Sequence, residues 1–511
     1  MLARILSYGL NGIEGYPVFV EVDIVNGLPS FETVGLPDAA VKESKDRVRS
    51  AIRNSGLEIL PARITVNLAP ADTKKEGSLY DLPIAIGLLA ATDQIPKTIL
   101  KDTLFIGELS LNGDIQPVQG VMPIAISARS AGYKRLIIPK GNSAEAQYID
   151  EIETYTPASL QELVRFLRGD IELTPLEHKQ WADIHSLNAA TVDFAQIKGQ
   201  KAAKRAAEIA AAGGHNLLMV GPPGSGKTMI ARAIPSILPD LTFAEALEVT
   251  KIHSIAGILD GASGIVTERP FRAPHHTASV AALSGGGTKA KPGEVSAAHN
   301  GVLFLDELPE YPRTALEALR QPLEDGVITV SRVYSTIAYP ARFMLVASMN
   351  PCPCGNYGSR DKECRCTLGQ IQKYLSKVSG PLLDRIDLQI EVDSITFSEI
   401  RRIENEESSE AMRKRVQKAR EIQSKRFVGT KCYCNAQMDS KMILKYCLLD
   451  KAAEDLMKNA FASLKMSARA YNRILKVARS IADLAGKEQV MAEHIAEAIQ
   501  YRSMDRKYWS Y

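Results

Sequence analysis

The sequence has no long apolar run and no excess of charge of either sign. The apolar stretch Pro83–Ala91 is half of the about 20 residues that a membrane-spanning helix needs, so we expect a buried helix there. The first residues also lack the apolar core of a signal peptide. With 62 Lys and Arg against 59 Asp and Glu, the formal net charge is +3, which excludes a globally basic nucleic-acid binder but not a local basic lining. We therefore expect a cytoplasmic protein without a membrane segment.

Cysteine is absent from the first 351 residues, and aromatic residues make up only 6% of the chain. The seven cysteines all lie between positions 352 and 447. An odd, clustered set excludes a secreted disulfide framework and indicates thiols or a bound metal. Hydrophobic residues at 45% and charged residues at 24% are ordinary values, so a disordered or collagen-like chain is excluded as well. At about 150 residues per domain, the length predicts about three domains.

Changes of pattern along the chain divide it into four segments. Residues 1–168 alternate short β-rich runs with helical stretches, which predicts an α/β domain. Residues 169–192 show no sustained periodicity and are interpreted as a linker. Residues 193–394 predict a second α/β domain, a parallel-sheet core with a cysteine-containing insert at 351–367. Residues 395–511 are helical and rich in charge, which predicts a C-terminal helical domain.

A phosphate-binding motif stands near the start of the second domain. It matches G-x-x-x-x-G-K-[ST] and lies between an apolar strand and a helix, the context that the motif requires. In such a loop backbone N–H groups surround the phosphates, a lysine reaches the β- and γ-phosphates, and a hydroxyl completes a Mg²⁺ shell. This predicts binding of ATP with Mg²⁺. The residues are Gly221, Pro222, Pro223, Gly224, Ser225, Gly226, Lys227 and Thr228.

Two acidic residues follow a second apolar strand some eighty residues later. Asp306 and Glu307 come directly after the run 301–305. We expect Asp306 to hold Mg²⁺ or its water and Glu307 to act as general base on the attacking water. Together with the phosphate loop, this pair predicts nucleotide hydrolysis.

Two further polar residues lie beyond later apolar runs. Asn350 ends the apolar strand 343–349, and in a parallel sheet its side chain would lie beside the γ-phosphate and orient the water. It is equally well explained as a turn former before Pro351. Arg385 lies between apolar positions and is either a structural ion-pair residue or a finger that completes a neighbouring subunit's site.

Five long strings make the whole chain resemble one family. They span residues 27–44, 269–279, 292–310, 350–355 and 467–479. They are similar to the YifB/ComM group of magnesium-chelatase-like AAA+ ATPases, whose ComM members are bacterial hexameric DNA motors. Those motors drive branch migration when homologous DNA is integrated during natural transformation. The resemblance implies an ATP-dependent DNA helicase that forms a homo-oligomer, a hexamer, with branched, single- or double-stranded DNA in its central pore and recombination proteins as further partners.

The resemblance also implies roles for single residues. Sensor 2 falls on Arg469, with Arg473 one helical turn further as the second choice. If the arginine finger acts in trans, hydrolysis requires a ring. The other assignments are Lys227 and Thr228 in Walker A, Asp306 and Glu307 in Walker B, Asn350 as sensor 1 and Arg385 as the arginine finger.

The N-terminal domain resembles the protease domain of Lon through the strings 109–118 and 131–140. Lon proteases use a serine nucleophile activated by a lysine. Aligning these strings places Asp81 at the serine position and Ile124 at the lysine position, and these side chains cannot form a Ser-Lys dyad. We therefore expect a Lon-like domain without proteolytic activity.

Four cysteines form two C-x-C pairs separated by nine residues. Cys352 and Cys354 make the first pair, and Cys364 and Cys366 make the second. Four soft ligands suit tetrahedral Zn²⁺, which predicts a zinc site directly after Asn350; four reduced thiols in a loop are the alternative. The later cysteines at 432 and 434 are interpreted as ordinary thiols.

Two loops are candidates for contact with DNA. The glycine-rich loop 284–293 offers Lys289 and Lys291 to phosphates. The hairpin-like segment 327–337 offers Arg332 as a charge and Tyr334 as a stacking face. A solvated surface turn is the alternative for each loop.

Other charged features have simpler interpretations. The basic helix 413–426 is more readily a solvated face than a DNA contact, and His275 and His276 are expected to form hydrogen bonds near the nucleotide. Two alternatives to a DNA motor remain at this stage: a magnesium-chelatase-type ATPase subunit, and a DNA-binding scaffold that uses ATP only to assemble.

Overall fold

Two β-sheets organise the chain, one in each of two units. The computed structural model describes residues 1–181, 192–259, 264–287, 290–332, 335–358, 362–394, 406–430, 432–464, 466–502 and 504–509. The first unit comprises Met1–His185 and Phe243–Thr267, and the second comprises Ser186–Thr242 and Glu268–Tyr511. Each unit is described by itself.

The first unit is built on a seven-stranded mixed sheet of order β3-β4-β2-β1-β5-β8-β9. Its long central strands β1 and β2 pair antiparallel, and Gly12 adopts a φ of 62° in the two-residue turn between them. A small antiparallel ribbon joins β6 to β7. The strands are β1 (Leu2–Asn11), β2 (Glu14–Val25), β3 (Ser30–Val34), β4 (Arg63–Ala69), β5 (Thr103–Phe105), β6 (Glu108–Leu109), β7 (Ile115–Gln116), β8 (Arg135–Ile137) and β9 (Glu153–Tyr155).

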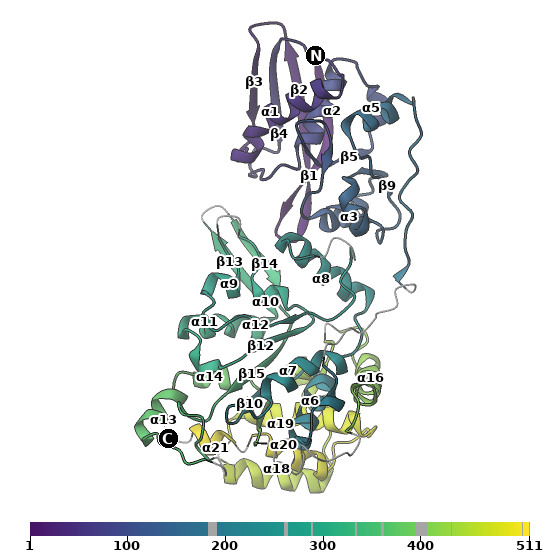
Figure 1. The fold of residues 1–511 in the computed structure, drawn as a ribbon. Helices are drawn as coiled ribbons and strands as arrows, with labels where there is room; N and C mark the ends of the chain where they lie inside the picture. The colour runs from purple at the N-terminus through teal and green to yellow at the C-terminus, as the bar shows by residue number, and fades with distance from the viewer. Residues whose placement is uncertain are drawn as a thin grey trace. The chain divides into compact units, whose positions relative to one another are not determined.

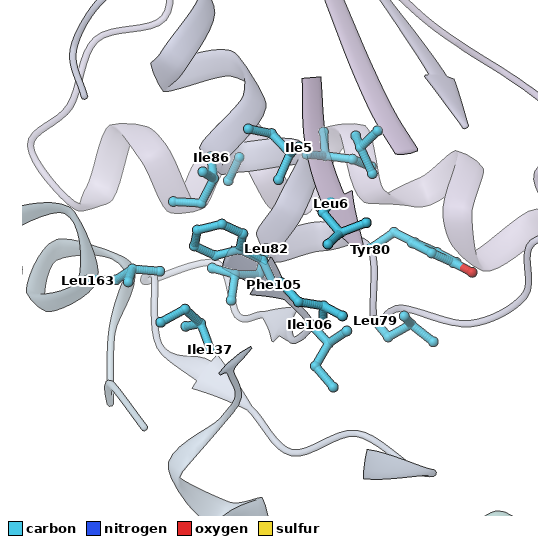
Figure 2. Packing of buried hydrophobic residues seen from close by; sticks show 14 of the residues in the cluster. Ile5, Leu6, Leu79, Tyr80, Leu82, Ile86, Phe105, Ile106, Ile137 and Leu163 are labelled. Carbon is cyan, nitrogen blue, oxygen red and sulfur yellow. The ribbon is translucent and has the colours of Figure 1, made fainter. Parts of the chain in front are cut away.

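The core of this unit lies between the sheet and its helices. Every residue of α2 is buried, as expected for the apolar stretch in that region, and the helix packs against β1 and β2. Figure 2 shows Leu82 and Ile86 of α2 among side chains from β1, β5, β8 and α5. Each such aliphatic side chain stabilises the fold by about 1.5–3 kcal/mol when fully buried. The helices are α1 (Ala39–Asn54), α2 (Asp81–Ala91), α3 (Val121–Ser130), α4 (Ser143–Ala146), α5 (Leu160–Arg168) and α8 (Phe243–Ala256).

Helix α8 comes from the middle of the sequence but groups with the N-terminal residues. The Ser254 hydroxyl donates a hydrogen bond of 2.7 Å to Glu145 and accepts one of 3.1 Å from the backbone N–H of Gly120. Both bonds span more than one hundred residues of sequence, so no local pattern indicates them. The sequence predicts this segment as part of the region 193–394, whereas its contacts tie it to the first unit.

The second unit contains a five-stranded parallel sheet of order β11-β12-β15-β10-β16. All five carboxyl ends therefore meet at one edge, the place where open parallel sheets bind ligands. A separate antiparallel hairpin, β13 with β14, forms where the sequence predicts one (Figure 1). The strands are β10 (Leu217–Val220), β11 (Phe271–Arg272), β12 (Val302–Leu305), β13 (Val327–Arg332), β14 (Ser335–Pro340), β15 (Met344–Met349) and β16 (Leu388–Glu391).

Helices supply the rest of the second unit. They are α6 (Lys201–Gly213), α7 (Lys227–Ala233), α9 (Val280–Ser284), α10 (Glu294–Ala297), α11 (Arg313–Ala318), α12 (Arg320–Asp325), α13 (Leu368–Leu375), α14 (Gly380–Leu383), α16 (Ser409–Arg426), α17 (Ser440–Tyr446), α18 (Lys451–Leu464), α19 (Ala468–Leu484), α20 (Ala492–Gln500) and α21 (Met504–Trp509). The fold class is α/β with a parallel core sheet and a helical C-terminal region, as predicted. None of the helices in the described ranges is long and apolar enough to cross a membrane.

A buried polar network joins the C-terminal helices to the core sheet. The fully buried ring of His215 places Nδ1 3.2 Å from Asp387 Oδ2 and Nε2 2.8 Å from the Ser480 hydroxyl on α19. His215 and Asp387 stand just before β10 and β16, whereas Ser480 comes from the C-terminal region. These satisfied polar contacts hold the helical region to the sheet.

The arginines of the basic helix α16 bind other parts of the second unit. Arg415 pairs with Glu208 on α6 at 2.5 Å, Arg420 donates to the Ala211 carbonyl at 3.0 Å, and Arg426 pairs with Asp483 on α19 at 2.5 Å. The intervening lysines remain exposed. The arginines of this helix therefore bind other parts of the second unit, while its exposed lysines agree with the predicted solvated face. Contact with DNA, the alternative, stays a prediction.

Candidate nucleotide site

The predicted phosphate loop connects β10 to α7 at the carboxyl edge of the sheet. Gly224 and Gly226 have φ values of 80° and 90°, which glycine adopts without strain. A Cβ on Gly221 would lie 2.1 Å from the Val392 carbonyl oxygen, so only glycine fits there. The loop is shaped to present backbone N–H groups, as phosphate binding requires.

Lys227 is held inside this loop. Its Nζ donates to the carbonyl oxygens of Gly221 and Pro222 at 2.7 and 2.8 Å and lies 3.4 Å from Asn350 Oδ1. Burial lowers the pKa of Lys227 to about 8, opposed by the nearby Asp306 and Glu307. The structure thus brings Asn350 to the lysine of the loop, and its role beside the γ-phosphate stays a prediction.

Thr228 and Asp306 lie within hydrogen-bonding distance of each other. The Thr228 hydroxyl donates to Asp306 Oδ2 at 2.9 Å. A hydroxyl and a carboxylate this close can share one hard cation, because Mg²⁺ prefers oxygen ligands. The donors present therefore fit Mg²⁺ together with the phosphates of a nucleotide.

Ser348 is a site residue that the sequence does not single out. Its hydroxyl donates a short hydrogen bond to Asp306 Oδ1. The parallel register aligns Leu305 of β12 with Ala347 of β15, so the next residues, Asp306 and Ser348, are neighbours. The available signal was a single hydroxyl near the end of an otherwise apolar strand.

Glu307 points its carboxylate into a more open environment. Its backbone has a φ of 53°, and its N–H donates to Asp306 Oδ1 at 3.1 Å. The side chain is 54% exposed and lies 3.5 Å from Nδ1 of His276, while His275 contacts the Thr277 hydroxyl at 2.9 Å. An accessible carboxylate next to Asp306 fits what a general base on water requires, and this role of Glu307 stays a prediction.

Arg385 forms an ion pair within its own chain. Its Nη2 donates to Glu324 Oε2 at 2.5 Å and its Nη1 to the Pro381 carbonyl at 2.6 Å. The Arg385 side chain is 10% exposed. Within the part of the chain that the structure describes, it makes no bond to the phosphate loop. This is the structural ion pair that the sequence allows, and a role in a neighbouring subunit stays a prediction.

The two sensor 2 candidates differ in environment. Arg469 stands in the first turn of α19, is 70% exposed and lies 3.9 Å from Asp384. Arg473 is mostly buried and lies 3.6 Å from Asp387. In the described ranges neither arginine bonds to the phosphate loop, so the choice between them stays open.

The four paired cysteines come together after β15. The sulfur of Cys352 lies 3.4 Å from that of Cys354 and 3.7 Å from that of Cys364, and the Cys354 and Cys364 sulfurs are 3.6 Å apart. All four sulfurs, including Cys366, lie within 4.8 Å of one another. For metal–sulfur bonds of about 2.3 Å, the edge of a tetrahedron is about 3.8 Å. The cluster therefore has the dimensions of a tetrahedral zinc site.

Backbone hydrogen bonds favour the thiolate of one of these cysteines, whereas burial and the neighbouring sulfurs raise the pKa values of Cys364 and Cys366. Backbone hydrogen bonds from Asn356 and Arg365 lower the pKa of Cys354 to about 6, and the Tyr357 N–H donates to the Cys352 sulfur at 3.3 Å. N–H groups that point at ligand sulfurs are typical surroundings of a bound metal. In contrast, the Cys432 thiol donates a hydrogen bond of 3.2 Å to the backbone carbonyl of Cys434, as an ordinary thiol does.

The predicted DNA contacts are only partly described. Lys289 and Tyr334 lie outside the described residues. The backbone of Lys291 exchanges hydrogen bonds of 2.9 Å with that of Gly286, which closes the neck of the glycine-rich loop. Arg332 is the last residue of β13, at the tip of the hairpin.

Asp81 in the first unit forms a buried ion pair where the resemblance to Lon places a nucleophile. Arg47 on α1 donates to both carboxylate oxygens at 2.6 and 3.0 Å. Burial raises the pKa of Asp81 to about 6, and the arginine opposes the rise. Ile124 is fully buried in α3. The positions of the Lon serine and lysine are therefore occupied by a carboxylate in an ion pair, Asp81, and by a buried hydrocarbon side chain, Ile124.

The parallel sheet carries a phosphate loop after β10 and two acidic residues after β12, and Asn350 follows β15, the strand between them. This arrangement defines a P-loop ATPase of the AAA+ class. The family "Magnesium chelatase, subunit ChlI" matches residues 193–400. The family "Subunit ChlI of Mg-chelatase" matches residues 20–142, and "Magnesium chelatase, subunit ChlI C-terminal" matches residues 406–502.

Full-length relatives define the family more closely. The chain is 47% identical over 509 residues to "Competence protein ComM" of Haemophilus influenzae, covering 99% of this chain and 98% of the relative. It is 44% identical over 496 residues to protein YifB of Escherichia coli, covering 97% and 96%. The chain belongs to the YifB/ComM family of magnesium-chelatase-like AAA+ ATPases. Membership implies a nucleotide and Mg²⁺ as cofactors.

The Lon-like character of the N-terminal region is also confirmed. The chain is 29% identical over 147 residues to "Lon protease 2" of Bacillus subtilis, covering 27% of this chain and 26% of the relative. The predicted family and fold class are thus both correct.

The affinity for ATP is expected to fall by up to about tenfold per pH unit as the pH rises from about 7.5 to about 9. Lys227 has a pKa of about 8 in the free site, and nearby phosphate charges raise it on binding, so ATP binding takes up a proton. Calorimetry in buffers of different ionisation enthalpy measures this uptake. Lys227→Arg, which keeps its charge throughout, should show none; a wild-type affinity independent of pH would contradict the assignment.

Proposed function

We propose that the protein is an ATP-driven DNA motor that moves branched DNA during homologous recombination in natural transformation. The observation that carries the proposal is the near-complete alignment, at 47% identity, with a protein named for competence. The assembled ATP site supports it, because directional movement of DNA consumes free energy that nucleotide hydrolysis supplies. The cytoplasmic location that the sequence predicts for this protein agrees with such a role.

The geometry of the ATP site supports the roles that we propose for its residues. Lys227 would bind phosphate, Thr228 and Asp306 would hold Mg²⁺, and Asn350 would orient the attacking water. Glu307 takes the proton from that water. The bound Mg²⁺ supplies charge stabilisation on the phosphates.

Residues from the ring interface and the helical region complete the active form. Arg385 would leave Glu324 and reach the nucleotide of the adjacent subunit in a homo-oligomeric ring, a hexamer. Arg469 or Arg473 would approach the phosphates from α19. A protein that is fully active as a monomer would contradict the role given to Arg385.

DNA would be held in the ring's pore by a few basic loops. Lys289, Lys291 and Arg332 would contact phosphates, and Tyr334 would stack on a base. Repetition around a ring multiplies these few charges, which reconciles DNA binding with a net charge of only +3. Recombination proteins are the proposed further partners.

Two other functions make different predictions. A magnesium-chelatase-type subunit, favoured by the matched family descriptions, would hydrolyse ATP without moving DNA. A scaffold that assembles with ATP would bind DNA without moving its strands. Forked or four-way DNA incubated with protein, ATP and Mg²⁺ separates the three, because only the motor displaces strands in a manner that requires hydrolysis.

The four-cysteine cluster is proposed to bind one Zn²⁺ per chain. Full-length protein purified without a metal-affinity tag is expected to contain about one zinc atom per chain, and Cys354→Ser should lose most of it because only three ligands remain. Elemental analysis measures this. Less than about half a zinc per wild-type chain would contradict the proposal.

The Lon-like domain is proposed to have no peptidase activity. The Asp81–Arg47 ion pair and the buried Ile124 supply neither a nucleophilic hydroxyl nor a lysine base. A role in DNA contact or in ring stability fits such a domain.

A further inference from the structure

The cysteine cluster is linked to the ATP site at its first residue. Only Pro351 separates Cys352 from Asn350, whose amide oxygen lies 3.4 Å from Lys227 Nζ. Cys352 is fully buried. A metal bound to its sulfur therefore fixes the chain two residues from the side chain that faces the phosphates.

A second link comes from the turn between the cysteine pairs. Gly355 has a φ of 79°, and a Cβ added there would lie 2.5 Å from Cδ of Pro223 in the phosphate loop. The backbone of the cysteine segment thus packs directly on the loop that holds the nucleotide. The Gly355 N–H donates to the Cys352 carbonyl at 3.0 Å, so the turn is fixed relative to the first cysteine.

A third link lies where the chain leaves the cluster. Thr367, directly after Cys366, caps α13 through a reciprocal pair of hydrogen bonds with Gln370. On the same helix Tyr374 is buried, which raises its pKa, and a hydrogen bond with the Asn350 backbone opposes the rise. The segment therefore leaves the ATP site at Asn350, passes through four cysteines and returns to Asn350.

We propose that the metal in the four-cysteine site positions Asn350 and the phosphate loop, so that ATP hydrolysis depends on this metal although it does not touch the nucleotide. This inference rests on the proposed zinc site and extends it to the ATPase. Four metal–sulfur bonds replace weak thiol contacts as the restraint on residues 352–366. A shift of about 1 Å in a positioning group can cost about 100-fold in rate.

The test compares variants that differ in metal ligands. Cys366→Ser leaves three sulfurs, whereas Cys366→His keeps a four-ligand set of a kind that zinc accepts. Cys434→Ala, a buried cysteine outside the cluster, is the matched control. Zinc content, kcat, KM and the Kd for a fluorescent ATP analogue are measured on the full-length protein.

The expected result is a loss of zinc and a fall of at least about tenfold in kcat for Cys366→Ser, with the Kd for nucleotide changed less than about threefold. Cys366→His should retain zinc and most of the rate, and Cys434→Ala should match wild type. Removing zinc from wild type with a chelator, then restoring it, should lower and recover kcat, which tests the coupling even if a variant fails to fold.

Gly355→Ala separates the coupling from metal binding. It should keep zinc, because no ligand changes, yet lower kcat, because the new methyl group displaces Pro223. If protein from which zinc has been removed keeps a wild-type kcat, the inference is overturned, but the proposal that the four cysteines bind zinc is not. Wild-type protein without zinc refutes the zinc proposal, and wild-type protein without ATPase activity refutes the proposed hydrolysis.

Discussion

Replacement of Glu307 by Gln is expected to lower kcat for ATP hydrolysis by at least about 100-fold, while the Kd for ATP stays within about threefold. The amide cannot accept the proton of the attacking water, but the ligands of phosphate and Mg²⁺ remain. Glu307 is suited to this test because its side chain is 54% exposed and its ion-pair partner His276 is 32% exposed. Steady-state ATPase rates and analogue binding measure the two quantities.

Glu310→Gln is the matched control for that experiment. Glu310 stands three residues away, is 43% exposed and pairs with Lys377 on the surface, so its loss should change the rate by less than about twofold, as for most exposed pairs. If Glu307→Gln kept more than a tenth of the wild-type rate, another group would have to be the base.

Removal of Arg47 is expected to destabilise the first unit by about 3–5 kcal/mol, the usual cost of breaking a buried ion pair. Arg47→Met leaves the carboxylate of Asp81, which is fully buried, without its cation. Urea titrations in which hydrogen exchange of α2 and β1 is measured report the free energy of unfolding of this unit. Arg49→Met, on the same helix and over the Phe31 ring, is the control for loss of an arginine.

The double variant Arg47→Met/Asp81→Leu should recover most of the lost stability, because an apolar pair replaces a stranded charge. The pH dependence has a definite sign. Asp81 has a pKa of about 6 in the folded unit and about 3.9 unfolded, so its contribution favours folding below about pH 4 and is lost as the pH rises through 6. Failure of the double variant to recover would contradict this account of Arg47.

Local patterns predict the elements that carry the ATP site. Apolar runs that end at glycine, an acid or asparagine correspond to β10 (Leu217–Val220), β12 (Val302–Leu305) and β15 (Met344–Met349), because buried parallel strands are apolar on both faces. The phosphate loop is as easily found, since its glycines are needed for backbone shape. The parallel sheet then brings Asp306 and Asn350 to one edge.

Contacts between distant residues escape such patterns. Glu324, which pairs with Arg385 at 2.5 Å, is one exposed acid among many in the sequence. The network of His215, Asp387 and Ser480 joins residues up to 265 positions apart. Each depends on the completed fold, so hydrophobic periodicity and motif spacing carry no signal for it.

Charge composition predicts an exposed face but not the partners of individual charges. The segment 413–426 is interpreted from composition as a solvated face, and its lysines are exposed, but its arginines also pair with Glu208 and Asp483 of the second unit. Arginine suits buried pairing because its planar group makes two parallel hydrogen bonds. The positions of the partners, not the charges themselves, decide the outcome.

Strand displacement on a labelled four-way DNA junction tests the central claim most directly. With ATP and Mg²⁺, the wild-type protein is expected to convert the junction into two duplexes, whereas Glu307→Gln should bind the junction without converting it, and Glu310→Gln should act as wild type. Rapid ATP hydrolysis by wild-type protein with no conversion of the junction, or conversion at the same rate by Glu307→Gln, would contradict an ATP-driven DNA motor.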